Sequence, residues 1–338
     1  MEIMPKSDKI QSSRPIHQSF TGRRRHAFGN SSDPHSPIFS IATNVSIMDA
    51  PRITCTLPHW LRTFRDLPSE LLIIVDKTPP GGRIAALHKI LDGAEELCSK
   101  LRRLELLDSR IRIVEAVTPN EPRAKELSSR WFKYGTPFRC QAGTPILAFI
   151  QAIEDASTDL ILRCDCDMLF SESGWLCRSL MLVDTGEVDL VEPSRLGING
   201  VARSLDVSTR AFLLHRTHFR ERILPIKPHS LDICRRIHRY LHRRPAWLAL
   251  EQMLQIEKSK ATLRHLVLSD ERDGFSMHVA RRQDFLLTNF SHVVSSVETA
   301  SIPDAQRRAG WNFTAEAWAQ FNVGQHIDRR NPERPGRK

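Results

Sequence analysis

Two aspartates separated by a single residue follow a short apolar run near the middle of the chain. The run DLILRCD at 159–165 is typical of a buried strand, so Asp165 and Asp167 are expected at its carboxyl end. Two carboxylates held this close repel each other unless a cation lies between them. A hard divalent ion such as Mg2+ or Mn2+ prefers oxygen ligands and often shares its coordination shell with phosphate oxygens. The pair therefore predicts a metal site that could neutralise a diphosphate, and the plainer alternative is a capped strand end.

The strand also predicts where these side chains point. Because side chains alternate along a strand, the two aspartates should face one side together. The intervening Cys166, like Cys164, should face the other side and pack beneath flanking helices as a small apolar group.

Two further residues could complete such a site. Glu251 lies in the stretch PAWLALEQMLQIEK, whose apolar residues recur at helical spacing, and an acid beside apolar neighbours can take a proton from a hydroxyl group. His278 follows Asp273-Gly274 in a loop that leads into a short strand, and neutral imidazole can join carboxylates around a metal ion. Each residue has a plainer reading, Glu251 as a solvent-facing glutamate and His278 as a structural histidine.

The elements that would position these residues alternate between strands and helices. Apolar runs predict strands at 37–44, 70–76, 110–117, 159–165 and 188–194, and helical spacing predicts helices at 53–67, 83–107 and 144–157, the first of them kinked or begun near Pro58. This order indicates an α/β fold with a doubly wound, mostly parallel sheet.

In such a sheet, ligands collect at the carboxyl ends of the strands. Thr43 and Asn44 close the first predicted strand, Asp76 closes the second and Glu115 lies near the end of the third. Asp76 could accept a hydrogen bond from a nucleotide base, or it could only cap the turn into the Pro-Pro-Gly-Gly loop.

The overall composition is that of a folded, basic protein. The 338 residues are 41% hydrophobic and 26% charged, and the formal net charge of +10 favours anionic partners. Seven cysteines at irregular spacings are expected to be reduced thiols of a cytoplasmic protein, without a structural zinc site. The sequence contains no run of about 18 apolar residues, so we expect no membrane span. Its first residues form no apolar segment, so we expect no secretory signal.

Taken together, the motifs resemble the nucleotide-sugar-dependent glycosyltransferases of the GT-A fold, in particular their family-2-like group. The resemblance covers roughly residues 37–285 and rests on FSIATN, on ELLIIVD ending in Asp76, on TPILAFIQAIEDASTDLIL and on Asp165-Cys166-Asp167. It implies a nucleotide-sugar donor, a carbohydrate or other hydroxyl acceptor, and Mg2+ or Mn2+.

The resemblance also implies a role for each candidate residue. Asp165, Asp167 and His278 would hold the metal ion, and Glu251 would deprotonate the acceptor hydroxyl, which then attacks from the opposite face with inversion. The expected contacts to the nucleotide are Thr43, Asn44, Asp76, Arg139 and Asp165. Residues 37–295 form the expected transferase domain, residues 1–36 a disordered basic tail, and residues 296–338 a short helix and a second basic tail.

The chain departs from the family pattern in several places. Family 2 often continues the second strand with Asp-Asp-Gly-Ser, whereas here Asp76 is followed by Lys-Thr-Pro. The usual Arg-Asn pair is replaced by FRCQAGTP, in which Arg139 and Gln141 are the candidate substitutes. Gln252 follows Glu251 where a second acid is common, although one carboxylate suffices for a base.

Two basic segments lie beyond the central motif. Residues 206–225 resemble the strand and helix that follow the sheet crossover in this family, and four of them could border the diphosphate: Thr209, Arg210, His215 and Arg216. Residues 230–244 predict a basic amphipathic helix, which could rest on an anionic membrane or bind a polyanion, or be only a solvated face.

Two other functions compete with the transferase. In phosphotransferases of the haloacid dehalogenase type, Asp-x-Asp supplies a nucleophile and an acid, but the motif lies near the first strand and Thr or Val, not Leu169, stands two places beyond the second aspartate. A catalytically idle binding protein for RNA or an acidic glycan would fit the charge. Against RNA, the chain has only two tyrosines and no run of interleaved aromatic and basic residues, so no nucleic-acid partner is expected.

Overall fold

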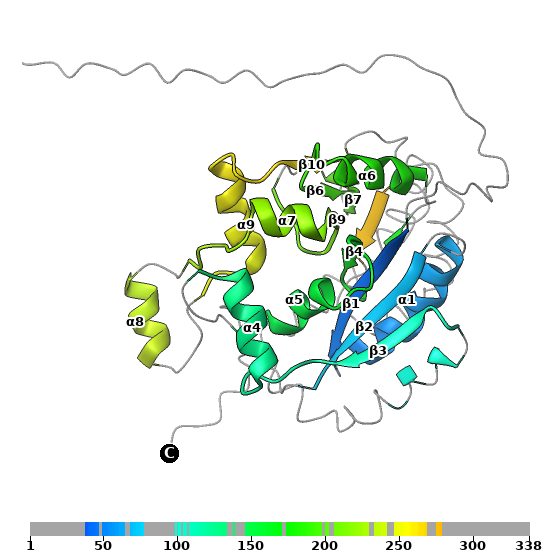
Figure 1. Cartoon of the computed structure of the whole chain (residues 1–338), viewed down its shortest axis with the longest axis horizontal. Helices are drawn as coiled ribbons and strands as arrows, with labels where there is room; N and C mark the ends of the chain where they lie inside the picture. The colour runs from blue at the N-terminus through cyan, green and yellow to red at the C-terminus, as the bar shows by residue number, and fades with distance from the viewer. Residues whose placement is uncertain are drawn as a thin grey trace, which may run out of the picture. The chain divides into compact units, whose positions relative to one another are not determined.

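The fold is built around a seven-stranded sheet. The computed structural model describes residues 38–278 except for gaps at 47–48, 65–67, 78–98, 100, 103, 107, 134–137, 139–145, 171–173, 198–199, 203–205, 230–232, 242–246 and 269–274. The sheet has the strand order β10-β6-β9-β4-β1-β2-β3, and among these strands β9 alone is antiparallel to its neighbours (Figure 1). The expected α/β fold with a mostly parallel sheet is confirmed.

The strands of this sheet are short and mostly buried. Their bounds are β1 (Phe39–Ser46), β2 (Pro68–Asp76), β3 (Ile111–Glu115), β4 (Leu160–Cys164), β6 (Leu190–Glu192), β9 (Ala211–His215) and β10 (His265–Val267). The central strands β1, β2 and β4 are buried along most of their length because helices cover both of their faces.

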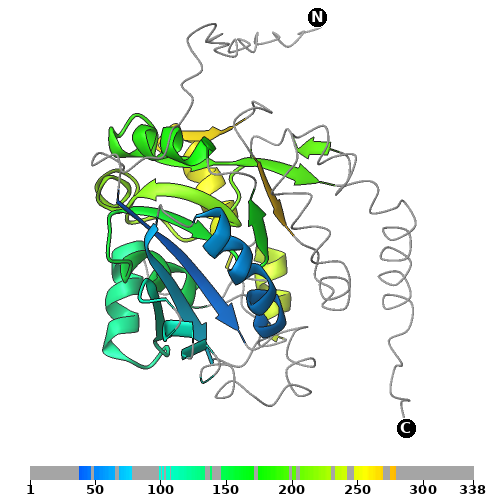
Figure 2. The ribbon, with the colours of Figure 1, turned by 90° about the vertical axis from the view of Figure 1, so that its right-hand side faces the viewer.

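Helices on opposite faces of the sheet build two apolar cores. On one face, α1 (Ala50–Thr63) and α6 (Gly174–Asp184) pack over side chains such as Ile41 and Cys164. On the other face, α4 (Pro122–Trp131) and α5 (Leu147–Glu154) pack over side chains such as Ala42 and Ile161. Figures 1 and 2 show α1 on one side of β1 and β2, with α4 and α5 on the other.

A second, four-stranded sheet continues from the strands that carry the candidate site. It has the order β5-β11-β7-β8, formed by β5 (Met168–Phe170), β11 (Phe275–His278), β7 (Ser194–Gly197) and β8 (Gly200–Ala202). β5 follows β4 after the Asp-Cys-Asp turn, and β7 follows β6 after Pro193. Two strands of the small sheet, β5 and β7, therefore begin just after the carboxyl ends of β4 and β6.

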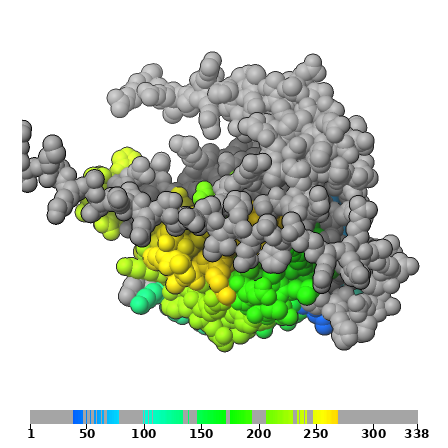
Figure 3. All heavy atoms as spheres, turned by 90° about the horizontal axis from the view of Figure 1, so that it is seen from above, coloured from blue at the N-terminus to red at the C-terminus, as the bar shows by residue number. Residues whose placement is uncertain are grey.

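Three helices complete the described part of the chain. They are α7 (Arg216–Arg222), α8 (Ile233–Leu241) and α9 (Leu250–Ser259). In the space-filling view, the yellow surface of α9 and β10 lies beside green surface from the middle of the chain, as the pairing of β10 with β6 requires (Figure 3).

Several element bounds differ from those expected. The first helix starts well before Pro58 and passes through it. Pro51 occupies the first turn, where a missing N–H is tolerated. Within the predicted helix 83–107, the structure describes helical residues only from Ser99 to Glu105. The carboxyl-terminal helix and both basic tails lie outside the described residues.

A buried carboxylate ties α4, α5 and α7 together. The Glu154 side chain is 0% exposed and accepts hydrogen bonds from Arg130 at 2.5 Å, from Trp131 at 2.8 Å and from Arg220. Burial by itself would raise the pKa of Glu154, but the hydrogen bonds from Arg220, Trp131 and Arg130 outweigh it and hold the pKa below its usual range.

This cluster predicts a pH-dependent stability. Glu154→Gln should lower the free energy of unfolding by about 3 kcal/mol at neutral pH, because it leaves two arginines without their buried partner. A carboxyl with a depressed folded-state pKa contributes fully above its unfolded value and loses that contribution as the pH falls through the folded value. The gap between wild type and Glu154→Gln, measured by urea unfolding, should therefore shrink in acid, whereas Glu187→Gln on the surface should show no gap at either pH.

Candidate active site

Several of the candidate residues lie at the carboxyl edge of four neighbouring parallel strands. β1 ends at Ser46, β2 at Asp76, β3 at Glu115 and β4 at Cys164. The strand register sets Ser46 beside Asp76, so the ends of β1 and β2 lie at the same level. This is the edge at which ligands bind in open α/β sheets.

The two aspartates occupy a turn rather than the strand itself. β4 ends at Cys164, and the turn closes with a hydrogen bond of 3.3 Å from the Met168 N–H to the Asp165 carbonyl. The alternation expected for a strand therefore stops at Cys164. The Asp165 side chain is 37% exposed, whereas Asp167 is only 5% exposed. The more accessible carboxylate of the pair is Asp165.

The cysteines beside the aspartates are structural. Cys164 and Cys166 are buried in the core beneath α1 and α6, as expected from the sequence. Burial raises the pKa of the Cys164 thiol far above its ordinary range, so this thiol stays protonated and is no nucleophile.

Side chains of α1 hold the turn and β5 in place. Thr56 donates to the carbonyl of Cys166 at 2.5 Å, and Trp60 donates its ring N–H to the carbonyl of Met168 at 2.7 Å. His59 Nε2 accepts the backbone N–H of Phe170 at 3.0 Å. These three residues recur at helical spacing and point from α1 toward one segment. Hydrogen bonds between side chains of α1 and the backbone of this segment therefore hold the aspartate turn and β5 in place.

Arg163 joins β1 to the aspartate turn. It is 1% exposed, and its guanidinium donates to Asp165 Oδ1 at 3.0 Å and to Asn44 Oδ1, while its centre lies 4.2 Å from the centroid of the Phe149 ring. Its Nε is buried without a hydrogen-bond partner among the described residues. The structure therefore brings Asn44 and Asp165 together through a buried cation that the sequence analysis did not single out. A charged residue inside an apolar strand run was the available signal, because arginine is rarely buried unpaired.

Arg163→Met should reduce the free energy of unfolding by about 2–3 kcal/mol, because it removes two hydrogen bonds made by a buried charge. Arg102→Met is the matched control, since Arg102 is 59% exposed in its pair with Glu115, and its effect should stay within about 0.5 kcal/mol. Urea unfolding of the two variants compares them directly. Equal stability of the two variants would contradict the structural role given to Arg163.

Glu251 reaches the same edge from a distant part of the sequence. It lies half-buried in the first turn of α9, and its Oε2 accepts from Thr209 Oγ1 at 3.4 Å. Arg210 follows Thr209 in the chain, and its carbonyl accepts a hydrogen bond from the Asp165 N–H at 2.6 Å. A carboxylate and the aspartate turn are thus linked through two consecutive residues.

A buried polar network fixes this linking segment. The Glu192 carboxylate accepts the backbone N–H of Ser208 at 2.6 Å and lies 2.8 Å from His265 Nε2. Lys258 Nζ lies 2.9 Å from the other ring nitrogen of His265. Gln255 Oε1 also accepts the N–H of Val207 at 2.8 Å. The segment before β9, which carries Thr209 and Arg210, is therefore held by residues of β6, α9 and β10.

His278 comes to the aspartate turn through strand pairing. β11 runs antiparallel to β5 and sets His278 opposite Met168, the residue that follows Asp167. His278 is placed here by its backbone register alone. Among residues with described side chains, no group of three His, Cys, Asp or Glu is arranged around a common metal position.

The remaining candidates are placed less uniformly. Asp76 is 3% exposed, and strand alternation puts it on the same face as Asn44. Thr43 points to the opposite face, where its hydroxyl is buried without a hydrogen-bond partner among the described residues. Arg139 lies outside the described residues.

His215 and Arg216 lie at the opposite edge of the sheet. His215 pairs with Leu160, at the start of β4, and Arg216 binds Asp159 through its side chain at 2.8 Å. Because β9 is antiparallel to β4, its end lies beside the beginning of β4. Of the four residues expected at the diphosphate, Thr209 and Arg210 lie at the candidate site, and His215 and Arg216 do not.

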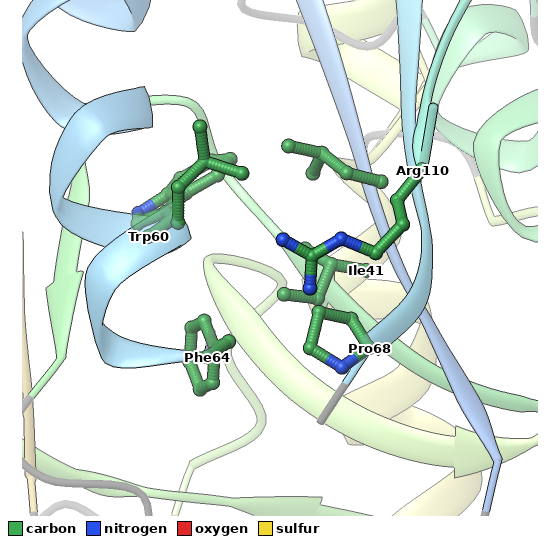
Figure 4. Close-up of a pocket in the computed structure, with 7 residues that line it drawn as sticks. Ile41, Trp60, Phe64, Pro68 and Arg110 are labelled. Atoms are coloured by element: carbon green, nitrogen blue, oxygen red, sulfur yellow. The ribbon is translucent and has the colours of Figure 1, made fainter. Parts of the chain in front are cut away.

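A small apolar pocket also lies at that opposite edge (Figure 4). Pro68, which begins β2, and Arg110, which precedes β3, border it together with residues of α1 and β1; the full lining is Ile41, Trp60, Leu61, Phe64, Pro68, Leu71 and Arg110. It has room for about one water molecule, so it is too small for a nucleotide.

Comparisons with known proteins give distant structural likenesses. No protein-family model matches the chain, and no curated protein sequence matches it. One similar structure is the galactosyltransferase LgtC in complex with donor and acceptor sugar analogues, with 13% identity, a TM-score of 0.37, and coverage of 69% of this chain and 74% of that one.

Two other similar structures were determined with nucleotides and Mn2+. Glucosyl-3-phosphoglycerate synthase from Mycobacterium tuberculosis, in complex with Mn2+, UDP and phosphoglyceric acid, has 14% identity, a TM-score of 0.38, and coverage of 82% of this chain and 79% of that one. The mannosyltransferase PcManGT from Pyrobaculum calidifontis, with GDP-Man and Mn2+, has 12% identity, a TM-score of 0.42, and coverage of 83% and 71%. This chain is similar in structure to these glycosyltransferases, but the sequence identities and TM-scores are low. The ligands of those proteins are therefore not assigned to this chain.

Proposed function

We propose that this chain is a metal-dependent glycosyltransferase that moves a sugar from a nucleotide-diphosphate sugar to an acceptor hydroxyl, with inversion. The observation that supports this most is the link between the aspartate turn and Glu251. The Asp165 N–H binds the Arg210 carbonyl, and the adjacent Thr209 binds Glu251. An acid able to act as a base thus lies beside a pair of acids able to hold a cation, at the ligand-binding edge of the sheet.

The carboxylate oxygens at the turn are of the ligand type that a hard divalent cation prefers. Asp165 is partly exposed, Asp167 is buried, and the register of β11 sets His278 opposite Met168, the residue after Asp167. With His278 as the third ligand, two carboxylates and one imidazole would suit Mg2+ or Mn2+. When bound, such an ion would neutralise the charge that develops on the leaving diphosphate.

The chain's own residues would supply binding, orientation and proton transfer. Asp76, at the end of β2, would accept a hydrogen bond from the nucleotide base, and Asn44 would border the nucleotide from β1. Arg163 keeps Asn44 and Asp165 in fixed positions. Glu251 would take the proton of the acceptor hydroxyl as that oxygen attacks the anomeric carbon. A single displacement of this kind inverts the configuration and needs no nucleophile from the protein.

A donor-hydrolysis screen tests the proposed function. Purified protein is incubated with UDP-, GDP- and TDP-sugars, each with Mn2+, with Mg2+ or with a chelator, and the released nucleoside diphosphate is measured. We expect slow hydrolysis of one donor class, present with the metal and lost with the chelator. Absence of hydrolysis of every donor with either metal, together with binding of oligonucleotides, would favour the basic binding protein instead.

A further inference from the structure

Helix α8 exposes an unusual amount of apolar surface. Four of its large side chains are open to solvent, with exposed fractions of 62% for Ile233, 56% for Ile237, 83% for Tyr240 and 72% for Leu241. Large apolar residues are ordinarily buried, and several of them exposed together on one element mark a contact surface. These four residues are called the α8 apolar face below.

The α8 apolar face is continuous on the helix. At about 100° per residue, positions 233, 237, 240 and 241 fall within an arc of about 100°. Helical spacing places the four basic residues, Arg235, Arg236, His238 and Arg239, on the remaining surface. The helix therefore has an apolar side and a cationic side with no acid in its nine residues.

The surroundings of α8 are basic as well. The helix is followed in the sequence by His242, Arg243 and Arg244, and between residues 227 and 244 the one acid is Asp232. Figure 1 shows α8 standing apart from the other described helices and strands, at the margin of the fold. A partner surface that complements α8 would be apolar where it meets the α8 apolar face and negatively charged around it.

We propose that α8 docks this protein on the surface of an anionic lipid bilayer. An amphipathic helix with an apolar side and a basic side lies in the interface, its apolar side chains in the acyl boundary and its cations among acidic headgroups. Tyr240 suits this position because its ring is apolar and its hydroxyl is polar. The net charge of +10 adds attraction from the rest of the chain.

The docking is peripheral. No helix among the described residues is long and apolar enough to cross a bilayer. A nine-residue helix is only about 13 Å long, so it covers a patch of the interface and does not reach through it. The proposal stands independently of the proposed transferase activity.

Vesicle flotation of the full-length chain tests this proposal. Binding is measured on vesicles of phosphatidylcholine alone and of phosphatidylcholine mixed equally with phosphatidylglycerol. We expect wild type to float with the anionic vesicles and to remain unbound with the neutral ones. Ile237→Glu should lower the partition coefficient by at least about tenfold, because it places a charge in the apolar face. Arg236→Gln should lower it by about fivefold.

Two matched variants separate the helix from general charge effects. Leu106→Glu adds the same charge at an apolar residue that is 87% exposed outside α8, and Lys125→Gln removes one exposed cation from α4. Both should bind nearly as well as wild type. Equal loss in Ile237→Glu and Leu106→Glu would overturn the proposal, because the basic tails and overall charge would then explain binding. Failure to bind anionic vesicles, with Ile237→Glu converting a dimer to a monomer in sedimentation, would overturn it in favour of a second copy of the chain.

Discussion

Replacing Glu251 by glutamine is expected to lower kcat for sugar transfer by about 10²–10⁴-fold, the range typical for loss of a general base. Glutamine has nearly the same size and its side-chain oxygen can still accept from Thr209, so the fold around α9 should persist. It cannot take up the proton that the acceptor hydroxyl releases. Initial-rate kinetics with the donor found in the hydrolysis screen would measure kcat and KM separately.

Separate effects on kcat and KM distinguish a catalytic role of Glu251 from a structural one. Donor KM should stay near the wild-type value in Glu251→Gln, because Glu251 is assigned to the acceptor and not to the nucleotide. Glu221→Gln removes an exposed carboxylate from α7 and should leave both constants unchanged. Full activity in Glu251→Gln would remove Glu251 from the mechanism, and proton transfer would have to be assigned elsewhere.

Replacing Asp167 by asparagine should weaken Mn2+ affinity by more than about 100-fold. Mutation of a residue that only supports a metal ligand already lowers metal affinity by about 10–100-fold. The loss of a charged ligand itself should lower the affinity further. Transfer at low Mn2+ should fall in parallel, and high Mn2+ should restore part of it, which a collapse of the fold would not allow. Titration of activity against Mn2+ concentration measures both effects.

Asp184→Asn is the control for Asp167→Asn. The Asp184 side chain is 58% exposed at the end of α6, away from the turn, and its loss should leave the Mn2+ dependence unchanged. If Asp167→Asn and wild type show the same Mn2+ dependence, the aspartate turn is a structural turn and no metal site.

The sheet was predictable because burial on both faces leaves a plain signature. The run ELLIIVD predicted β2 and its end at Asp76, and the apolar run before Asp165 predicted β4. Strands such as β5 and β8 have only three residues each, too few to show a period. They are fixed by pairing partners that lie far away in the sequence.

The orientation of the site residues was less predictable. The expectation that Asp165 and Asp167 share one side assumed an extended strand, whereas the chain turns after Cys164. The turn and β5 are held by Thr56, His59 and Trp60 of α1. The spacing of residues within the aspartate motif does not predict those contacts.

Contacts between distant segments were beyond the reach of sequence reasoning. Glu192, His265 and Lys258 lie in three separate elements, and each has an ordinary sequence context. The pairing of β6 with β10 brings Glu192 and His265 together, and Lys258 joins them from α9 to hold the segment that carries Thr209. A single sequence shows which residues could do chemistry, and the tertiary structure decides which of them meet.

The most direct test of the account is the thermal stability of wild type with nucleoside diphosphates, measured with and without Mn2+. A ligand at about 100 times its Kd stabilises the folded state by about 2.7 kcal/mol, enough for a clear rise in Tm. The account predicts that one nucleoside diphosphate raises Tm when Mn2+ is present and has little effect when it is absent. An equal rise without the metal, or a rise with oligonucleotides alone, would contradict it.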